Sequence, residues 1–191
     1  MSMLPAEPTP PPTGSDLAAR VERSLREYPD FPQPGVLFRD LGGLYADPGL
    51  FRDVVDEFGT TFGGDVDLVL GLEARGFVLG AALANSLGIP LVLARKPGRL
   101  PGDVHRAGYS LEYGENVLEI QRDAVVGGHR VLVVDDVLAT GGTLAAAARL
   151  VTEAGGTVAG MGVIVGLDGL GGEQVLREHR LRLLCTVPAG A

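Results

Sequence analysis

The strongest constraint on the fold lies at residues 131–143, where an aliphatic run is followed at once by acids, hydroxyls and glycines. Val131 to Val134 are four consecutive aliphatic residues, which predicts a strand buried on both faces. Residues 144–150 have the composition of a helix. A buried strand that runs directly into a helix is the repeating unit of an α/β fold. In such folds ligands bind beyond the carboxyl ends of the strands.

The connection between this strand and helix has the residue types of a sugar phosphate site. Backbone N–H groups at a helix start attract anions, and glycines let a phosphate approach the chain closely. A carboxylate pair accepts hydrogen bonds from a diol or holds hydrated Mg²⁺. The connection lacks both the lysine of a nucleotide P-loop and the glycine pattern of a dinucleotide site. The residues concerned are Asp135, Asp136, Ala139, Thr140, Gly141, Gly142 and Thr143.

This run resembles the phosphoribosyl diphosphate (PRPP) signature of type I phosphoribosyltransferases. The resemblance implies that Asp135 and Asp136 hold the ribose and that residues 139–143 grip the 5-phosphate. The alternative is an ordinary buried strand with a glycine turn. Two adjacent acids at a strand end have no packing use, which favours the ligand site.

The same resemblance predicts the architecture, a type I phosphoribosyltransferase-like parallel sheet flanked by helices with a small hood subdomain. We expect a flexible, proline-rich tail at residues 1–14 and a single domain at 15–191. The hood would comprise residues of about 28–45 and the C-terminal strand. Periodicity predicts helices near 16–28, 48–58 and 77–87, and strands near 66–70, 89–94, 158–165 and 181–187.

The proposed hood segment is rich in both apolar residues and prolines. Pro32 and Pro34 argue against a helix or a central strand over residues 30–41, and Pro29 ends the preceding helix. The segments 28–32 and 34–40 are similar to the opening of adenine phosphoribosyltransferases, where this region covers the purine. The resemblance implies that the Leu37 carbonyl and the Arg39 amide bind adenine, with Phe38 near the ring. A connection that only packs against the core is the alternative.

The chain is acidic, with a formal net charge of −8, so a site for a polyanion must concentrate cations locally. Cationic residues are found at two of the predicted strand ends. Arg75 lies in the segment 71–76, and Arg95 and Lys96 open the segment 95–102. Next to a phosphate site we expect them to bind pyrophosphate, although a solvated basic loop has the same composition. The resemblance also implies a cis peptide between Glu73 and Ala74. Residues 97–108 have the composition of a mobile lid.

Residues 109–114 and 117–120 alternate like the strands of a hairpin. The resemblance implies that Glu112 lies near the imidazole edge of the purine and transfers a proton; the alternative is a carboxylate on a solvated strand face. Three segments depart from the family pattern. They are Gly42-Gly43, where a hydroxyl residue and proline are usual, Gly166-Leu167-Asp168, where a Glu is usual, and Gly171-Gly172-Glu173, where Gly-Arg is usual.

We therefore expect an enzyme of purine salvage that converts adenine and PRPP to AMP and pyrophosphate. The resemblance implies a homodimer and Mg²⁺ bound mainly through PRPP, with no protein metal site. The single Cys185 and the lack of a long apolar run favour a cytoplasmic protein with no membrane partner, and the acidic charge argues against a nucleic-acid partner. Two alternatives remain: a phosphoribosyltransferase for another base, such as xanthine or orotate, and a non-catalytic regulatory protein that senses PRPP.

Overall fold

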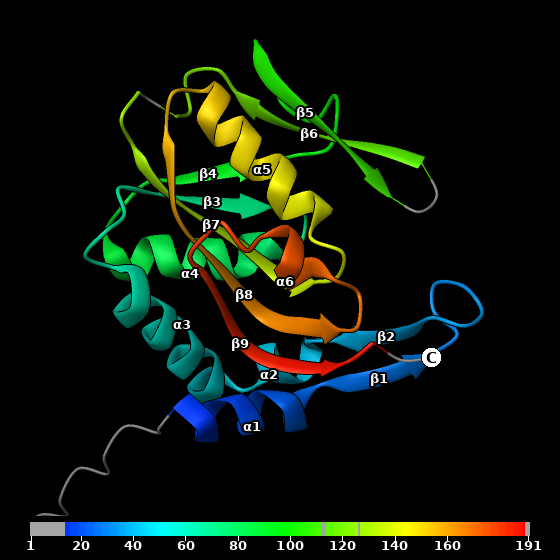
Figure 1. Ribbon diagram of the computed structural model, residues 1–191. Coiled ribbons are helices and arrows are strands. Elements are labelled where there is room, and N and C mark those ends of the chain that lie inside the picture. The colour runs from blue at the N-terminus through cyan, green and yellow to red at the C-terminus, as the bar shows by residue number, and fades with distance from the viewer. Residues whose placement is uncertain (1–13, 112–113, 126, 190–191) are drawn as a thin grey trace, which may run out of the picture.

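The computed structural model describes residues 14–111, 114–125 and 127–189 and has a five-stranded sheet at its centre (Figure 1). In hydrogen-bonding order the strands are β4 (Leu91–Ala94), β3 (Leu68–Leu72), β7 (Arg130–Leu138), β8 (Thr157–Asp168) and β9 (Leu181–Pro188). All four neighbouring pairs are parallel, so the strands end at one common edge. The predicted fold class is confirmed.

Helices cover both faces of this sheet. The long ones are α3 (Pro48–Phe62), α4 (Gly76–Leu87) and α5 (Gly142–Glu153). Leu132 and Val134 of β7 belong to the apolar cluster that contains residues of α3 and α4. Val131 and Val133 belong to the opposite cluster, which contains residues of α5. The strand is therefore buried on both faces, as its unbroken aliphatic run predicted.

Local sequence explains where α3 begins. The Asp47 carboxylate accepts hydrogen bonds from the N–H groups of Gly49 and Leu50, both at 3.0 Å, and Pro48 occupies the first turn. An N-cap of this kind contributes about 1 kcal/mol to helix stability. The helix buries one apolar face, which confirms the predicted helix. The residues of that face are Leu50, Val54, Val55, Phe58 and Phe62.

The first helix is shorter than its sequence predicted. α1 covers Gly14–Ser24, and Arg26–Pro29 form a strand, β1, instead of a last helical turn. β1 pairs antiparallel with β2 (Leu37–Asp40), and the Arg39 guanidinium forms an ion pair with Glu27 across the ribbon. This pairing between two segments that are separated by residues 30–36 overrides the helical periodicity of residues 16–28. The ribbon is separate from the central sheet, as expected from Pro32 and Pro34. The short helix α2 (Gly42–Ala46) follows it.

The C-terminal strand, which we expected to be part of the hood, runs parallel to β8 in the central sheet as β9. Its end meets the β1–β2 ribbon, where the Pro188 carbonyl accepts a hydrogen bond from the Arg39 side chain at 3.1 Å. The main body of β9 is half-buried or buried against β8, which explains its place in the sheet.

A second ribbon, the β5–β6 hairpin, consists of β5 (Val104–Leu111) and β6 (Gly114–Gln121). The predicted strands at 109–114 and 117–120 were too short, and residues 104–108 of the predicted lid belong to β5. Ala107, Leu118 and Ile120 are buried in the same cluster as α5, and this burial holds the segment as a strand. In Figure 1 this hairpin and the β1–β2 ribbon project on either side of the edge where the sheet strands end.

Candidate functional site

The acid pair lies inside β7, close to its carboxyl end, and not after the strand as we predicted. Asp135 is 9% exposed and Asp136 5% exposed. The Asp135 carboxylate accepts a hydrogen bond from the Asp136 N–H at 2.9 Å. Burial raises the pKa of both carboxyl groups, and the neighbouring Asp136 charge raises the pKa of Asp135 further. Two buried acids with raised pKa values at the ligand-binding edge of an α/β sheet indicate a functional site.

Arg75 connects the acid pair to the β1–β2 ribbon. It precedes α4, and its Nε lies 2.8 Å from Asp136 Oδ2. The same guanidinium lies over the Phe38 ring of β2, 5.1 Å from the ring centre. The structure thus brings together three predicted site residues that the chain places on a loop, a sheet strand and the ribbon.

The predicted phosphate-binding segment, residues 139–143, leads into the amino end of α5. Gly141 has φ +83° and precedes the first helical residue, Gly142. A side chain at Gly141 would be strained by this backbone conformation and would place its Cβ 2.9 Å from the Gly172 carbonyl oxygen. The first N–H groups of a helix have no partner within it, so they are available to an anion. This location suits the role predicted for Ala139, Thr140, Gly141, Gly142 and Thr143.

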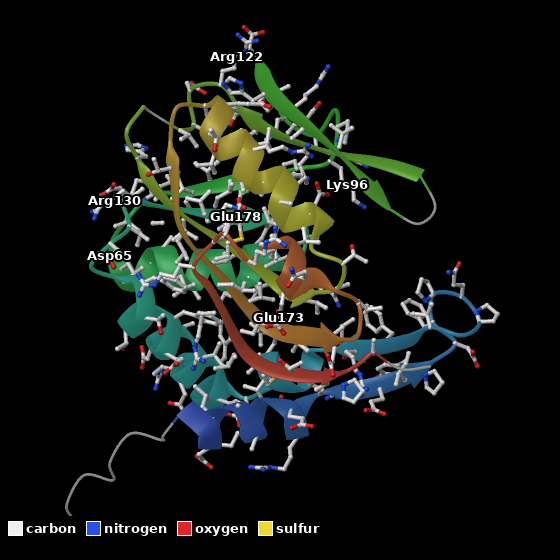
Figure 2. All side chains as sticks on the ribbon, viewed as in Figure 1. Asp65, Lys96, Arg122, Arg130, Glu173 and Glu178 are labelled. Atoms are coloured by element: carbon white, nitrogen blue, oxygen red, sulfur yellow. The ribbon has the colours of Figure 1, made fainter. Side chains whose placement is uncertain are left out.

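The segments predicted to bind pyrophosphate lie against each other. Glu73 Oε2 accepts hydrogen bonds from the Lys96 N–H at 2.6 Å and from Arg95 Nε at 3.3 Å. These contacts hold the pKa of Glu73 below its ordinary value, the Lys96 N–H having the largest effect. The peptide between Glu73 and Ala74 is cis, as the family resemblance implied. Figure 2 shows Lys96 on the side of the molecule where the sheet strands end.

The predicted base-binding residues lie on β2, which pairs with β1 alone among the strands of the described residues. In an antiparallel strand the backbone groups of residues i and i+2 point to the same side. The Leu37 carbonyl and the Arg39 N–H therefore share one side of β2, as recognition of two neighbouring purine atoms requires. The Arg39 side chain is bound by Glu27 and Pro188, so its backbone is the part suited to the base. Glu112, the predicted proton-transfer residue, lies outside the described residues.

The structure also shows site neighbours that the sequence analysis missed. The Tyr45 hydroxyl of α2 is buried, and burial together with the nearby Asp136 charge raises the pKa of Tyr45. A Cβ at Gly172, the first residue of the short helix α6 (Gly172–Val175), would collide with the Ala139 carbonyl oxygen. The adjacent glycines 171 and 172 were the only available sign of this close approach.

Two of the segments that depart from the family pattern line one cavity. It has a volume of about 380 Å³ and lies beside Ala139 of the predicted phosphate segment. Gly166, Leu167 and Asp168 at the end of β8 form part of its wall, together with residues 171–173. The departures from the family pattern therefore lie next to the predicted phosphate segment.

Neither a metal cluster nor a membrane span occurs in the part of the chain that the structure describes. Residues 14–111, 114–125 and 127–189 contain no group of three or more His, Cys, Asp or Glu side chains arranged to hold a metal ion. None of the helices formed by these residues is long and apolar enough to cross a membrane.

Comparison with known proteins assigns the family. The phosphoribosyl transferase domain family matches residues 49–188. An adenine phosphoribosyltransferase of Salinispora arenicola is 50% identical over 176 residues, which are 92% of this chain and 94% of the relative. The chain belongs to the adenine phosphoribosyltransferase family. A second family member, from Solibacter usitatus, is 51% identical over 81% of this chain and 90% of its own length.

Solved structures of the family have the same fold. The Saccharomyces cerevisiae adenine phosphoribosyltransferase, in complex with adenine and an imino-altritol bisphosphate, matches with a TM-score of 0.84 and 36% identity. The match covers 89% of this chain and 99% of the yeast chain. The Thermoanaerobacter pseudethanolicus enzyme gives a TM-score of 0.85 at 39% identity, with the same two coverages.

Proposed function

We propose that the chain transfers the 5-phosphoribosyl group of PRPP to adenine and so forms AMP and pyrophosphate, a reaction of purine salvage. The observation that carries this proposal is the meeting of Asp136, Arg75 and Phe38 at the edge where the sheet strands end. One guanidinium there contacts both Asp136, one of the two predicted ribose carboxylates, and Phe38 of the predicted adenine segment. The relatives named above support adenine as the base.

The site's charges suit this chemistry. Breaking the bond between the ribose and pyrophosphate builds positive charge on the sugar and negative charge on the leaving group. Asp135 and Asp136 would stabilise the sugar, and Arg95 and Lys96 would stabilise the pyrophosphate. Arg75, which is also predicted to bind pyrophosphate, forms an ion pair with Asp136 in this structure. The amino end of α5 would hold the 5-phosphate, so reactant geometry is fixed at both ends of the ribose.

Mg²⁺ fits this site as an ion that binds together with PRPP. The acid pair supplies oxygen ligands, which Mg²⁺ prefers, but two carboxylates leave most of its six positions to water and phosphate oxygens. Bound with PRPP, the ion would neutralise charge on the diphosphate. Asp135 and Asp136 would then orient the ribose hydroxyls rather than hold the metal alone.

The same proposal includes a homodimer in the cytoplasm. The buried, unpaired Cys185 is compatible with a reducing compartment. Light scattering after size-exclusion chromatography tests the oligomeric state, and fractionation of the source cells tests the location. A monomer in solution would overturn the homodimer, and protein found outside the cytoplasmic fraction would overturn the location.

AMP formation from adenine, PRPP and Mg²⁺ distinguishes the enzyme from a PRPP-sensing protein. We expect turnover by the purified chain and its loss when PRPP is replaced by ribose 5-phosphate, which lacks the leaving group. PRPP binding without turnover would favour the sensor. Turnover with xanthine or orotate and none with adenine would favour the other-base alternative.

A further inference from the structure

The β5–β6 hairpin contains a buried acid that none of the roles above uses. Glu119 of β6 is 1% exposed, although it carries a charge and comes from an alternating strand. We propose that Glu119 is a positioning residue that fixes the segment 95–98 in the orientation required for pyrophosphate. This inference rests on the proposed function of that segment.

Both the side chain and the backbone of Glu119 bind the segment. Its Oε2 accepts a hydrogen bond from the Gly98 N–H at 3.0 Å. Its backbone N–H donates to the Arg95 carbonyl at 2.7 Å, and its carbonyl accepts from the Arg95 N–H at 2.9 Å. Residues 95 and 98 are thereby both attached to one residue, which determines the course of the chain between them.

The second carboxylate oxygen of Glu119 carries an ion pair within the hairpin. Oε1 lies 2.7 Å from Arg106 Nε of β5, a side chain that is 68% exposed. This pairing compensates the buried negative charge, which would otherwise be costly and would repel an anion nearby. Glu119 therefore orients the cationic segment without weakening its attraction for pyrophosphate.

Glu73 also binds the segment 95–98, from the side opposite Glu119. It binds the Lys96 N–H and Arg95 Nε, so the ends of the segment are held by two acids from different elements. The bond to Nε leaves the outer guanidinium nitrogens of Arg95 as the atoms that can reach a ligand. Because charge stabilisation of a leaving group depends on preset geometry, loosening one attachment should weaken pyrophosphate binding selectively.

The test compares Glu119→Ala and Glu119→Gln with a matched control, Glu57→Ala. Glu57 forms a 2.5 Å ion pair with Arg182 near the start of β9, at the sheet edge opposite the site. Binding of Mg²⁺-pyrophosphate is measured by calorimetry, and the KM values for pyrophosphate and AMP are measured in the reverse reaction. Thermal unfolding establishes that each variant is folded at the assay temperature.

For Glu119→Ala we expect the pyrophosphate Kd and KM to rise about 10-fold or more, with the AMP KM within about 2-fold of wild type. Glu119→Gln retains an acceptor for the Gly98 N–H and should recover part of the loss. Glu57→Ala should lower the melting temperature without changing pyrophosphate binding. Wild-type pyrophosphate affinity in both Glu119 variants, or an equal loss in Glu57→Ala, would overturn the proposal. If the wild type forms no AMP, the reaction assignment fails while calorimetry still decides the role of Glu119.

Discussion

The Nε atom of Arg75 lies 2.8 Å from Asp136 Oδ2 while the same guanidinium covers the Phe38 ring. One side chain therefore touches the groups assigned to ribose and to adenine. A Lys at this position keeps the charge but loses the planar stack on Phe38. We expect Arg75→Gln to raise the KM for PRPP by about 10-fold or more, because the ion pair orients Asp136.

Steady-state kinetics on Arg75→Gln and Arg75→Lys separate the two contacts. The Lys variant should retain more PRPP affinity than the Gln variant, while both should have a higher KM for adenine through the lost ring contact. Unchanged KM values for both substrates in the Gln variant would show that Arg75 contributes to the binding of neither PRPP nor adenine.

Asp135→Asn should lower the activity and also change how the stability of the protein depends on pH. Asn retains an oxygen that accepts the Asp136 N–H but removes the charge, so we expect kcat to fall about 100-fold. The folded-state pKa of Asp135 is raised by burial and by Asp136, so wild-type stability falls as pH rises from the ordinary aspartate pKa toward the raised value. Asn does not ionise, so the variant does not lose stability in this way as pH rises.

Urea unfolding of wild type and Asp135→Asn at several pH values measures the effect. We expect the stability of the Asn variant relative to wild type to increase with pH above about 4. A relative stability that declines over this range would contradict the burial argument, and an unchanged kcat would contradict the assigned role.

Local sequence patterns predicted the parts of the fold that are determined locally. Four aliphatic residues were enough to identify β7, because burial on both faces leaves no alternation, although the strand runs on to Leu138. The helix predicted at 144–150 is α5, which begins two residues earlier at Gly142. β1 was mistaken for helix because its partner, β2, lies across a turn that periodicity does not detect. The sequence analysis gave Glu119 no role beyond a place in an alternating strand, since its burial arises only when the hairpin meets the segment 95–98. Likewise, a glycine required for close approach, such as Gly172, resembles an ordinary turn residue until the folded neighbours are known.

Gly172→Ala tests this close approach. Its Cβ would collide with the Ala139 carbonyl, so α6 and the phosphate segment must separate. We expect a higher KM for PRPP and a lower melting temperature, with a smaller change in the adenine KM. Gly64→Ala is the matched control, because a Cβ there meets no atom within 4 Å. Equal kinetics in the two variants would show that the contact does not shape the phosphate site.

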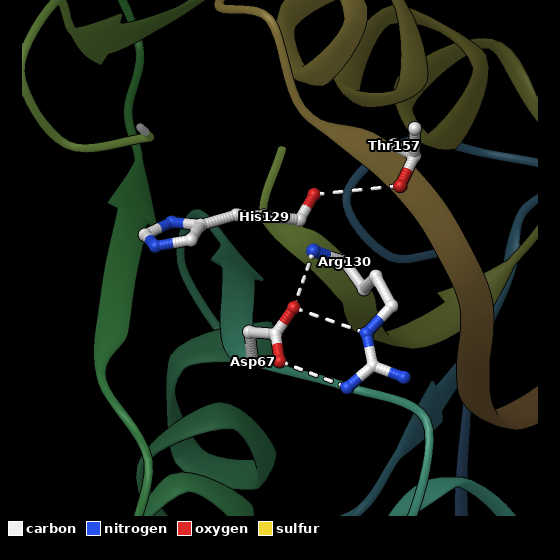
Figure 3. Close-up of polar contacts among 4 residues, drawn as sticks. All are labelled: Asp67, His129, Arg130 and Thr157. Carbon is white, nitrogen blue, oxygen red and sulfur yellow. Dashed lines mark hydrogen bonds and ion pairs between the residues drawn. The ribbon is translucent and has the colours of Figure 1, made fainter. Parts of the chain in front are cut away.

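The ion pair between Asp67 and Arg130 joins the amino ends of β3 and β7, at the edge opposite the site (Figure 3). The Asp67 carboxylate accepts hydrogen bonds from the Arg130 N–H at 2.9 Å, from Nε at 3.1 Å and from Nη2 at 2.9 Å. The hydrogen bonds from the Arg130 side chain contribute most to lowering the pKa of Asp67 to about 2. A depressed pKa stabilises the fold above the unfolded-state value, and that stability is lost as pH falls toward 2.

Asp67→Asn should therefore lower the melting temperature at neutral pH, with a difference that shrinks below about pH 4. Asp65→Asn, which removes an exposed ion pair with Arg180, is the control and should have a smaller effect. Melting curves across this pH range provide the measurement. A difference for Asp67→Asn that stays constant down to the lowest pH would exclude the ion pair as its source.

Competition among purine bases tests the central claim most directly. Adenine offers a donor at position 6 and an acceptor at N1, which match the Leu37 carbonyl and the Arg39 N–H on one side of β2. Hypoxanthine and guanine offer the reverse pattern, so the main-chain groups would face partners of their own kind. With PRPP and Mg²⁺ saturating, we expect kcat/KM for adenine to exceed that for either oxopurine by about 10⁴-fold or more. Comparable kcat/KM values for adenine and an oxopurine would contradict the assignment of this chain to adenine.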